Sequence, residues 1–238
     1  MAITEDLQKE LDNILRAKWE TRSGQVVPET SDIVLGNSAV SIDATVLYAD
    51  LADSTGLVLI DKTIAAEVFK AYLHGTTRII RSNGGHIRSF DGDRVMGVFI
   101  GGFKNSSAAK TALQINHFFA QILVPKFTSF YSHLGSASYT LRQSVGVDTG
   151  AVHIIRSGIR NNNDLVWVGR GPNIAAKLCS IREDGYSSYI TKAVYNSLAD
   201  VAKISPTTGV NMWESRSWGG GQAYGVSDIY RSSWWVRP

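Results

Sequence analysis

The chain of 238 residues is 44% hydrophobic, enough to bury a core as one large domain or as a domain with an appendage. Its 24 basic and 21 acidic residues are mixed along the sequence, so the basic runs typical of duplex-binding proteins are missing. We therefore expect no nucleic-acid partner. The single cysteine, Cys179, excludes an internal disulfide framework and is typical of a reducing compartment.

The N-terminal segment predicts an appended helix. It is charged throughout, and no run of about 18 apolar residues follows, so we expect a cytoplasmic protein without direct membrane insertion. Residues 4–20 place apolar side chains at helical spacing, which predicts an amphipathic helix that serves as an appendage or an oligomer contact. The small polar residues of 26–40 are typical of a connection. We divide the chain into an N-terminal helix and connection, residues 1–40, and a main domain, residues 41–238.

The main domain alternates strand and helix patterns. Residues 41–51 are strand-like, an apolar helical face follows over 60–81, and Asp91-Gly92 joins two β-rich runs as a tight hairpin. The later pattern predicts a helix over 106–131, strands over 141–155 and 164–169, and a helix over 171–181. This order indicates an α/β fold, an α+β sandwich with a mixed sheet flanked by helices.

Two carboxylates are placed where strands end. Asp50 ends the first strand and Asp93 follows the hairpin turn, so the two converge if their strands are neighbours. Oxygen ligands of this kind suit Mg²⁺ or Mn²⁺, and two such ions stabilise the attacking and leaving oxygens of a displacement at phosphorus. The alternative is that Asp91-Gly92 is simply a turn.

The segment "LADSTG" joins the first strand to a helix. Backbone N–H groups at a helix N-terminus, with the hydroxyls of Ser54 and Thr55, form a site for phosphate oxygens. Asp53 belongs to this candidate phosphate site, and its alternative role is that of a plain N-cap.

Four blocks carry a resemblance to a known family. In order and spacing, "VLYADLADSTGL", "SFDGDRVMGVF", "SVGVDTGAV" and "VGRGPNIAAKL" resemble the class III nucleotidyl cyclases over about residues 41–200. The resemblance implies a ferredoxin-like palm core and attack of a ribose 3′-hydroxyl on the α-phosphate of its own nucleotide, with release of pyrophosphate. It also implies two divalent metal ions, Mn²⁺ or Mg²⁺, held by Asp50, Asp93 and the backbone carbonyl of Leu51.

The predicted helix at 171–181 carries the rest of the implied machinery. Asn173 matches the asparagine that positions the ribose, and Lys177 stands where the family usually has the arginine that stabilises the transition state. They are four residues apart, so they share a helix face. In this family the metals and this pair come from different subunits, which implies a homodimer with composite sites. Arg94 and Arg170 are further candidates for triphosphate contact.

The base-reading positions depart from the purine cyclases. Ser89 and Val166 replace the Lys and Asp that read adenine, and a valine accepts no hydrogen bond from an exocyclic amine. Tyr48 lies on the same strand face as Asp50 and adds bulk that favours a one-ring base. These features resemble the pyrimidine cyclases of the bacterial Pycsar antiphage systems, which make cyclic UMP or cyclic CMP for a separate effector.

We therefore expect a uridylate cyclase. Val166 offers cytosine's amine no acceptor, which favours UTP and cyclic UMP, with a cytidylate cyclase making cyclic CMP as the alternative. A second alternative is a catalytically weak, cyclase-like module for dimerisation or nucleotide sensing. Lys177 favours it, because lysine lacks the bidentate fork of arginine, whereas the presence of both aspartates favours an active enzyme.

Overall fold

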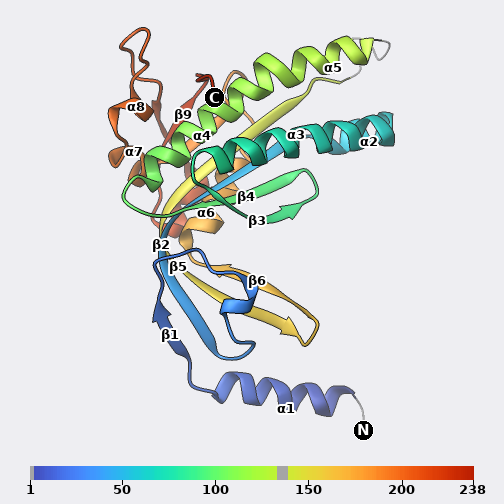
Figure 1. The fold of residues 1–238 in the computed structure, drawn as a ribbon, viewed down its shortest axis with the longest axis vertical. Coiled ribbons are helices and arrows are strands. Elements are labelled where there is room, and N and C mark those ends of the chain that lie inside the picture. Colours follow the sequence, from blue (N-terminus) through green and yellow to red (C-terminus); the bar gives the residue numbers. More distant parts are fainter. Residues whose placement is uncertain (1–2, 133–138) are drawn as a thin grey trace. The chain divides into compact units, whose positions relative to one another are not determined.

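The computed structural model describes residues 3–132 and 139–238 (Figure 1). The chain forms two compact units, each built from segments that are distant in sequence. The smaller unit comprises Met1–Asp43 and Ala151–Gly169, and the larger unit comprises Ala44–Gly150 and Arg170–Pro238. The domain boundary predicted after residue 40 stays a prediction.

The smaller unit holds an exposed helix, two complete strands and parts of two others. Its elements are α1 (Ile3–Arg16), β1 (Glu20–Ser23), the short η1 (Thr30–Asp32), the start of β2 (Ser38–Ala52), the end of β5 (Arg142–Ile159) and β6 (Asn162–Val168). β1 pairs with β2 in parallel, and β6 pairs with β5 in antiparallel fashion. The predicted N-terminal helix is confirmed as α1, although it ends at Arg16. β1 was not predicted, because its four exposed residues show no apolar alternation.

The larger unit is built on a mixed sheet. Its further strands are β3 (His86–Asp91), β4 (Arg94–Phe99), β7 (Ser188–Thr191), β8 (Glu214–Ser217) and β9 (Asp228–Ser232). The strand order is β3-β4-β2-β5-β7-β9-β8. β5 and β7 run parallel, while β4 pairs antiparallel with both β2 and β3. The predicted mixed sheet and the hairpin at Asp91-Gly92 are confirmed.

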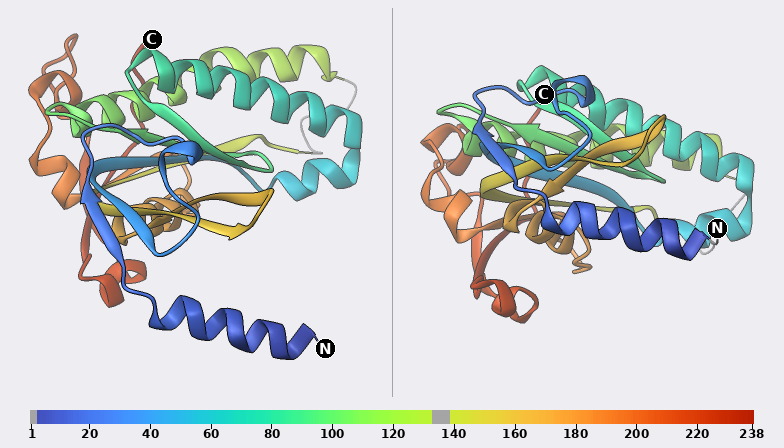
Figure 2. Two further views of the ribbon diagram at one scale, coloured as in Figure 1. Left: turned by 60° about the horizontal axis from the view of Figure 1, so that its bottom comes forward. Right: turned by 90° about the horizontal axis from the view of Figure 1, so that it is seen from below.

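Helices flank this sheet. They are α2 (Ser54–Ile60), α3 (Lys62–Ser82), α4 (Lys104–Phe118), the π-helical turn η2 (Phe119–Leu123), α5 (Val124–Phe130), α6 (Arg170–Cys179), α7 (Lys192–Asn196), α8 (Asp200–Lys203) and η4 (Gly219–Tyr224). Both views in Figure 2 show α3 and α4 side by side. Within the described ranges, no helix is long and apolar enough to cross a membrane.

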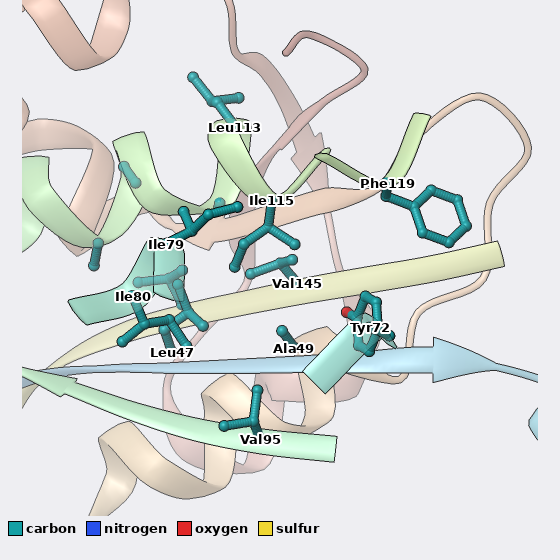
Figure 3. Close-up of a cluster of buried hydrophobic side chains, with 14 of the residues drawn as sticks. Leu47, Ala49, Tyr72, Ile79, Ile80, Val95, Leu113, Ile115, Phe119 and Val145 are labelled. Carbon is teal, nitrogen blue, oxygen red and sulfur yellow. The ribbon is translucent and has the colours of Figure 1, made fainter. Parts of the chain in front are cut away.

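A buried core fixes which face of the sheet is free for chemistry. Leu47 and Ala49 of β2 pack with Val95 of β4 beneath α3 and α4 (Figure 3). Successive side chains of a strand point to opposite faces, so Tyr48 and Asp50 point away from these helices. The sheet therefore presents the candidate site residues of β2 on its other face.

Helix α6 covers that other face. Ile174 and Leu178 of α6 belong to a second buried cluster with Tyr189 of β7 and Ile229 of β9. The helix also lies directly on β5 at Gly146, where a Cβ atom would stand 2.2 Å from the carbonyl oxygen of Ala175. Only glycine permits this close approach of helix and strand backbones.

We predict that Gly146→Ala destabilises the larger unit. The new methyl would overlap the α6 backbone, which cannot shift as a flexible side chain can, so the expected loss is about 1–3 kcal/mol of unfolding free energy. Urea denaturation measures it. Gly102→Ala is the control, because nothing lies within 4 Å of a Cβ atom there. Equal stability of the Gly146→Ala variant and the native protein would contradict the close contact.

Candidate active site

Asp50 is a buried carboxylate between two arginines. Only 7% of the residue is exposed. Its Oδ2 accepts a hydrogen bond from Arg182 Nη2 at 3.1 Å, and its Oδ1 lies 3.6 Å from Arg94 Nε. Burial raises the pKa of Asp50, Arg94 opposes this, and the nearby negative charge of Asp93 raises the pKa further. The site therefore concentrates charge of both signs at the end of β2.

Strand pairing brings the two predicted metal ligands together. The antiparallel register joins Tyr48 to Met96 and Ala49 to Val95, so the end of β2 meets the start of β4 beside the hairpin. Asp93 lies in that turn, close enough to Asp50 to shift its pKa. Asp93 Oδ2 is buried and has no hydrogen-bond partner among the described residues. An unpaired carboxylate oxygen of this kind is available to a cation.

The donor set fits a hard divalent ion. Both side chains are carboxylates, and the carbonyl of Leu51 would add a third oxygen, which suits Mg²⁺ or Mn²⁺ rather than a soft metal. No group of three or more His, Cys, Asp and Glu that could hold a metal occurs in residues 3–132 and 139–238. A bound ion would therefore need backbone and substrate oxygens as well. The metal roles of these residues stay predictions.

The candidate phosphate loop has an unusual backbone. Asp53 adopts a left-handed conformation with φ 55° and ψ 30°, and its side chain makes no cap hydrogen bond to α2. Ser54 and Thr55 begin α2, as the sequence predicted. Their contact with phosphate stays a prediction.

Tyr139 holds this loop in place and was not predicted. Its hydroxyl lies 3.1 Å from the carbonyl oxygens of both Ala52 and Asp53 and donates to them. Its ring would lie 3.3 Å from a Cβ atom at Gly56. Burial first, and then the charges of Asp53 and Asp93, raise the pKa of Tyr139 to about 12. No spacing in the sequence links this tyrosine to a loop 86 residues away.

Tyr48 and Ser89 come together across three strands. Met96 of β4 pairs with Tyr48 on one side and with Ser89 on the other, after an irregularity in the β3 register. The Tyr48 hydroxyl donates to Met96 Sδ at 3.3 Å, which fixes the ring, and burial raises the pKa of Tyr48. Met96 was not among the residues predicted for the site. Val166 lies on β6 in the smaller unit, where 43% of it is exposed.

Asn173 and Lys177 are both exposed on α6, four residues apart as predicted. Lys177 Nζ lies 5.5 Å from the centre of the Tyr224 ring, a cation–π distance. The two side chains are therefore presented on one accessible helix face.

Arg170 is held by the fold at the start of α6. Its Nε lies 3.3 Å from Oδ2 of the fully buried Asp148, and its Nη2 donates to the carbonyl of Thr149 at 3.2 Å. Asp148 also accepts a hydrogen bond from the Thr191 hydroxyl at 2.6 Å. The predicted triphosphate contact of Arg170 stays a prediction, and its observed partners anchor the helix.

Known proteins of similar sequence identify the family. No protein-family model matches the chain. A uridylate cyclase from Rhodovulum sp. (strain MB263) is 41% identical over 243 residues, covering 100% of this chain and 99% of the relative. A second, from Xanthomonas perforans, is 42% identical over 98% of both chains, and a third, from Burkholderia cepacia, is 42% identical over 92% of this chain and 93% of its own. The chain belongs to the uridylate cyclase family.

Solved structures show the fold of this family member. The adenylyl cyclase CyaB from P. aeruginosa superposes with a TM-score of 0.66 at 20% identity, over 82% of this chain and 95% of its own. The guanylyl cyclase Cya2 superposes with a TM-score of 0.65 at 17% identity, over 83% of this chain and 95% of its own. The resemblance to class III cyclases and the fold expected from it are thereby confirmed.

We predict that Tyr139→Phe loosens the candidate phosphate loop. The variant keeps the ring but loses the hydroxyl that binds the carbonyls of Ala52 and Asp53, a loss of about 1 kcal/mol. Hydrogen–deuterium exchange of the amides in residues 53–57 should rise about 5-fold. Tyr195→Phe is the control, because that hydroxyl accepts from Asn211 elsewhere in the unit. Unchanged exchange of the amides in residues 53–57 would show that the Tyr139 hydroxyl does not hold this loop.

Proposed function

We propose that this pyrimidine nucleotide cyclase converts UTP to 3′,5′-cyclic UMP and pyrophosphate. The observation that carries the proposal is the 41–42% identity to three uridylate cyclases over at least 92% of the chain. The clustering of Asp50, Asp93, Tyr48 and Ser89 at one end of the sheet supports it. The ribose 3′-oxygen attacks the α-phosphorus as its hydroxyl proton passes to solvent, a new P–O bond forms, and pyrophosphate leaves with the electrons of the broken P–O bond.

The acidic end of β2 would hold the cofactors. Asp50, Asp93 and the carbonyl of Leu51 would bind two divalent ions, Mn²⁺ or Mg²⁺, which when bound activate the 3′-hydroxyl and neutralise triphosphate charge. Backbone N–H groups at Asp53 and the hydroxyls of Ser54 and Thr55 would bind phosphate oxygens. Tyr139 holds the loop that carries these donors.

Helix α6 would position the sugar and stabilise charge. The Asn173 amide orients the ribose so that its 3′-hydroxyl lies in line with the α-phosphate. The Lys177 ammonium stabilises the negative charge that develops on the α-phosphate oxygens. Lysine binds as a point charge rather than a planar fork, so Lys177 needs less exact alignment than arginine would.

The base pocket would select a single ring. The Tyr48 ring, fixed by its bond to Met96, occupies room that a purine's second ring needs, and the Ser89 hydroxyl donates to or accepts from the base. Val166 stands where the purine cyclases have the aspartate that reads adenine, and it has no acceptor for the amine of cytosine, so uracil is favoured.

Partners and setting follow from the resemblance to class III and Pycsar cyclases. We propose a homodimer in which Asp50 and Asp93 of one subunit meet Asn173 and Lys177 of the other. Cyclic UMP would serve as a second messenger for a separate effector in antiphage defence. The cytoplasm is the proposed location, because nucleoside triphosphates are made and used there.

A catalytically weak, nucleotide-sensing cyclase-like module is the second candidate function. The observation that favours it is the pairing of Asp50 with Arg94 and Arg182, since two arginines already offset the negative charge that would attract a metal ion. An active cyclase forms a cyclic nucleotide from its triphosphate, whereas a sensing module binds the nucleotide and forms little or no product.

We predict that, when all four nucleoside triphosphates compete at equal concentration with Mn²⁺, cyclic UMP is the main product. Cyclic CMP should come next, and the purine products should be lower by about 100-fold, because the pocket does not pair with adenine and lacks room for a second ring. Mass spectrometry identifies the products. Cyclic CMP as the main product would favour the cytidylate alternative, and no product at all would favour the sensing module.

We predict that two inactive variants restore each other in a mixture. Asp93→Ala removes a proposed metal ligand and Lys177→Ala removes the transition-state cation, so each homodimer should be inactive. A heterodimer keeps one intact composite site, and random exchange of equal amounts should give about a quarter of native activity. If confirmed heterodimers stay inactive, the site lies within one chain.

A further inference from the structure

Arg182 joins two parts of the larger unit that the proposed reaction uses separately. It follows the end of α6, and its side chain is 29% exposed. One guanidinium nitrogen, Nη1, donates to the carbonyl of Cys179 at 2.7 Å and to that of Ile181 at 3.1 Å. The other, Nη2, donates to Asp50 Oδ2 at 3.1 Å. A single side chain thus binds the end of α6 and the predicted metal ligand on β2.

The chemistry of both partners favours a guanidinium. The last carbonyls of a helix lack partners within the helix, and its C-terminal end carries partial negative charge. Asp50 adds a full negative charge on the other side. A planar group with several fixed donors can bind both at once, whereas a lysine ammonium on the same stem presents a single point of charge.

The neighbouring acidic residues have other partners. Glu183 pairs with Arg231 at 3.0 Å and with Arg216, and Asp184 pairs with Arg142 at 3.1 Å. The carboxylate that receives Arg182 is therefore Asp50 rather than the acids next to it in the sequence.

The bond to Arg182 is compatible with a role for Asp50 as a ligand. A carboxylate has about four lone-pair directions, so Oδ2 can accept from Arg182 and keep a further direction for a cation. Metal-binding carboxylates are commonly held in orientation by such hydrogen bonds, and loss of the outer partner typically costs 10–100-fold in affinity or activity.

We propose that Arg182 is a positioning residue that couples the orientation of Asp50 to the C-terminal end of α6, the helix that carries Asn173 and Lys177. The physical coupling is independent of the substrate. Its consequence for catalysis rests on the proposed function: in a composite dimer these two parts of one chain serve different active sites, so Arg182 links them.

Hydrogen–deuterium exchange of the metal-free protein tests the coupling without turnover. Arg182→Ala should raise exchange at the last-turn amides, residues 177–180, about 5-fold, and Arg182→Lys should recover part of the protection. Asp50→Ala, which removes the acceptor, should also raise it, although Asp50 lies on a different element. Asp93→Ala is the matched control, because it removes the other aspartate and leaves the bond between Asp50 and Arg182 in place. Protection unchanged in Asp50→Ala but lost in Arg182→Ala would reduce Arg182 to a helix cap and overturn the proposal.

Subunit mixing tests the consequence for activity. In a heterodimer with Lys177→Ala, the intact site takes its metal ligands from the Lys177→Ala chain and its α6 from the aspartate variant. In the Asp50→Ala chain, Arg182 at the end of that α6 has lost its carboxylate partner, whereas in the Asp93→Ala chain it keeps it. The Asp50→Ala mixture should therefore recover several-fold less activity than the Asp93→Ala mixture. Equal recovery would overturn the link between sites. If neither mixture recovers, the composite site itself fails, and the exchange experiment still decides the coupling.

Discussion

The antiparallel register between β2 and β4 is the constraint on which the candidate site depends. It sets Tyr48 against Met96 and brings the end of β2 to the turn that holds Asp93. Burial of Leu47 and Ala49 under α3 and α4 fixes this register. A slip of one residue would turn Tyr48 and Asp50 into the apolar core and expose the leucine, so one hydrophobic pattern specifies both core and site.

Helix α6 is held at three points by different forces. Arg170 binds the buried carboxylate of Asp148 at its start, Gly146 allows backbone contact along its length, and Arg182 binds Asp50 at its end. Loss of Arg170 leaves the buried charge of Asp148 without its arginine, which is costly, and loss of Arg182 leaves Asp50 with Arg94 alone. These contacts hold the helix that exposes Asn173 and Lys177, and the role proposed for Lys177 would require such preorganisation.

The sequence allowed the elements to be predicted, because apolar periodicity and turn chemistry act over a few residues. The strand before Asp50, the Asp91-Gly92 hairpin and the helix with Asn173 were found in this way. The helix predicted over 60–81 is found as α3, which begins at Lys62 because the Asp61 side chain caps it by accepting hydrogen bonds from the amides of Thr63 and Ile64.

The long-range partners could not be predicted from one sequence. Arg182 lies 132 residues from Asp50 and Tyr139 lies 86 residues from Asp53, and no local pattern encodes such pairs. Arg170 was predicted as a triphosphate contact because it begins the helix that carries Asn173, while its ion pair is with Asp148, which only the folded sheet brings near. Ion pairs of this kind form only when the folded sheet brings distant residues together, so they depend on the tertiary structure.

The most direct test of the account is a crystal structure with Mn²⁺ and 3′-deoxy-UTP, a substrate analogue that lacks the attacking hydroxyl. The account predicts Mn²⁺ bound by carboxylate oxygens of Asp50 and Asp93, with the uracil ring beside Tyr48 and Ser89. Uracil bound away from Tyr48, or Mn²⁺ bound without either aspartate, would contradict it.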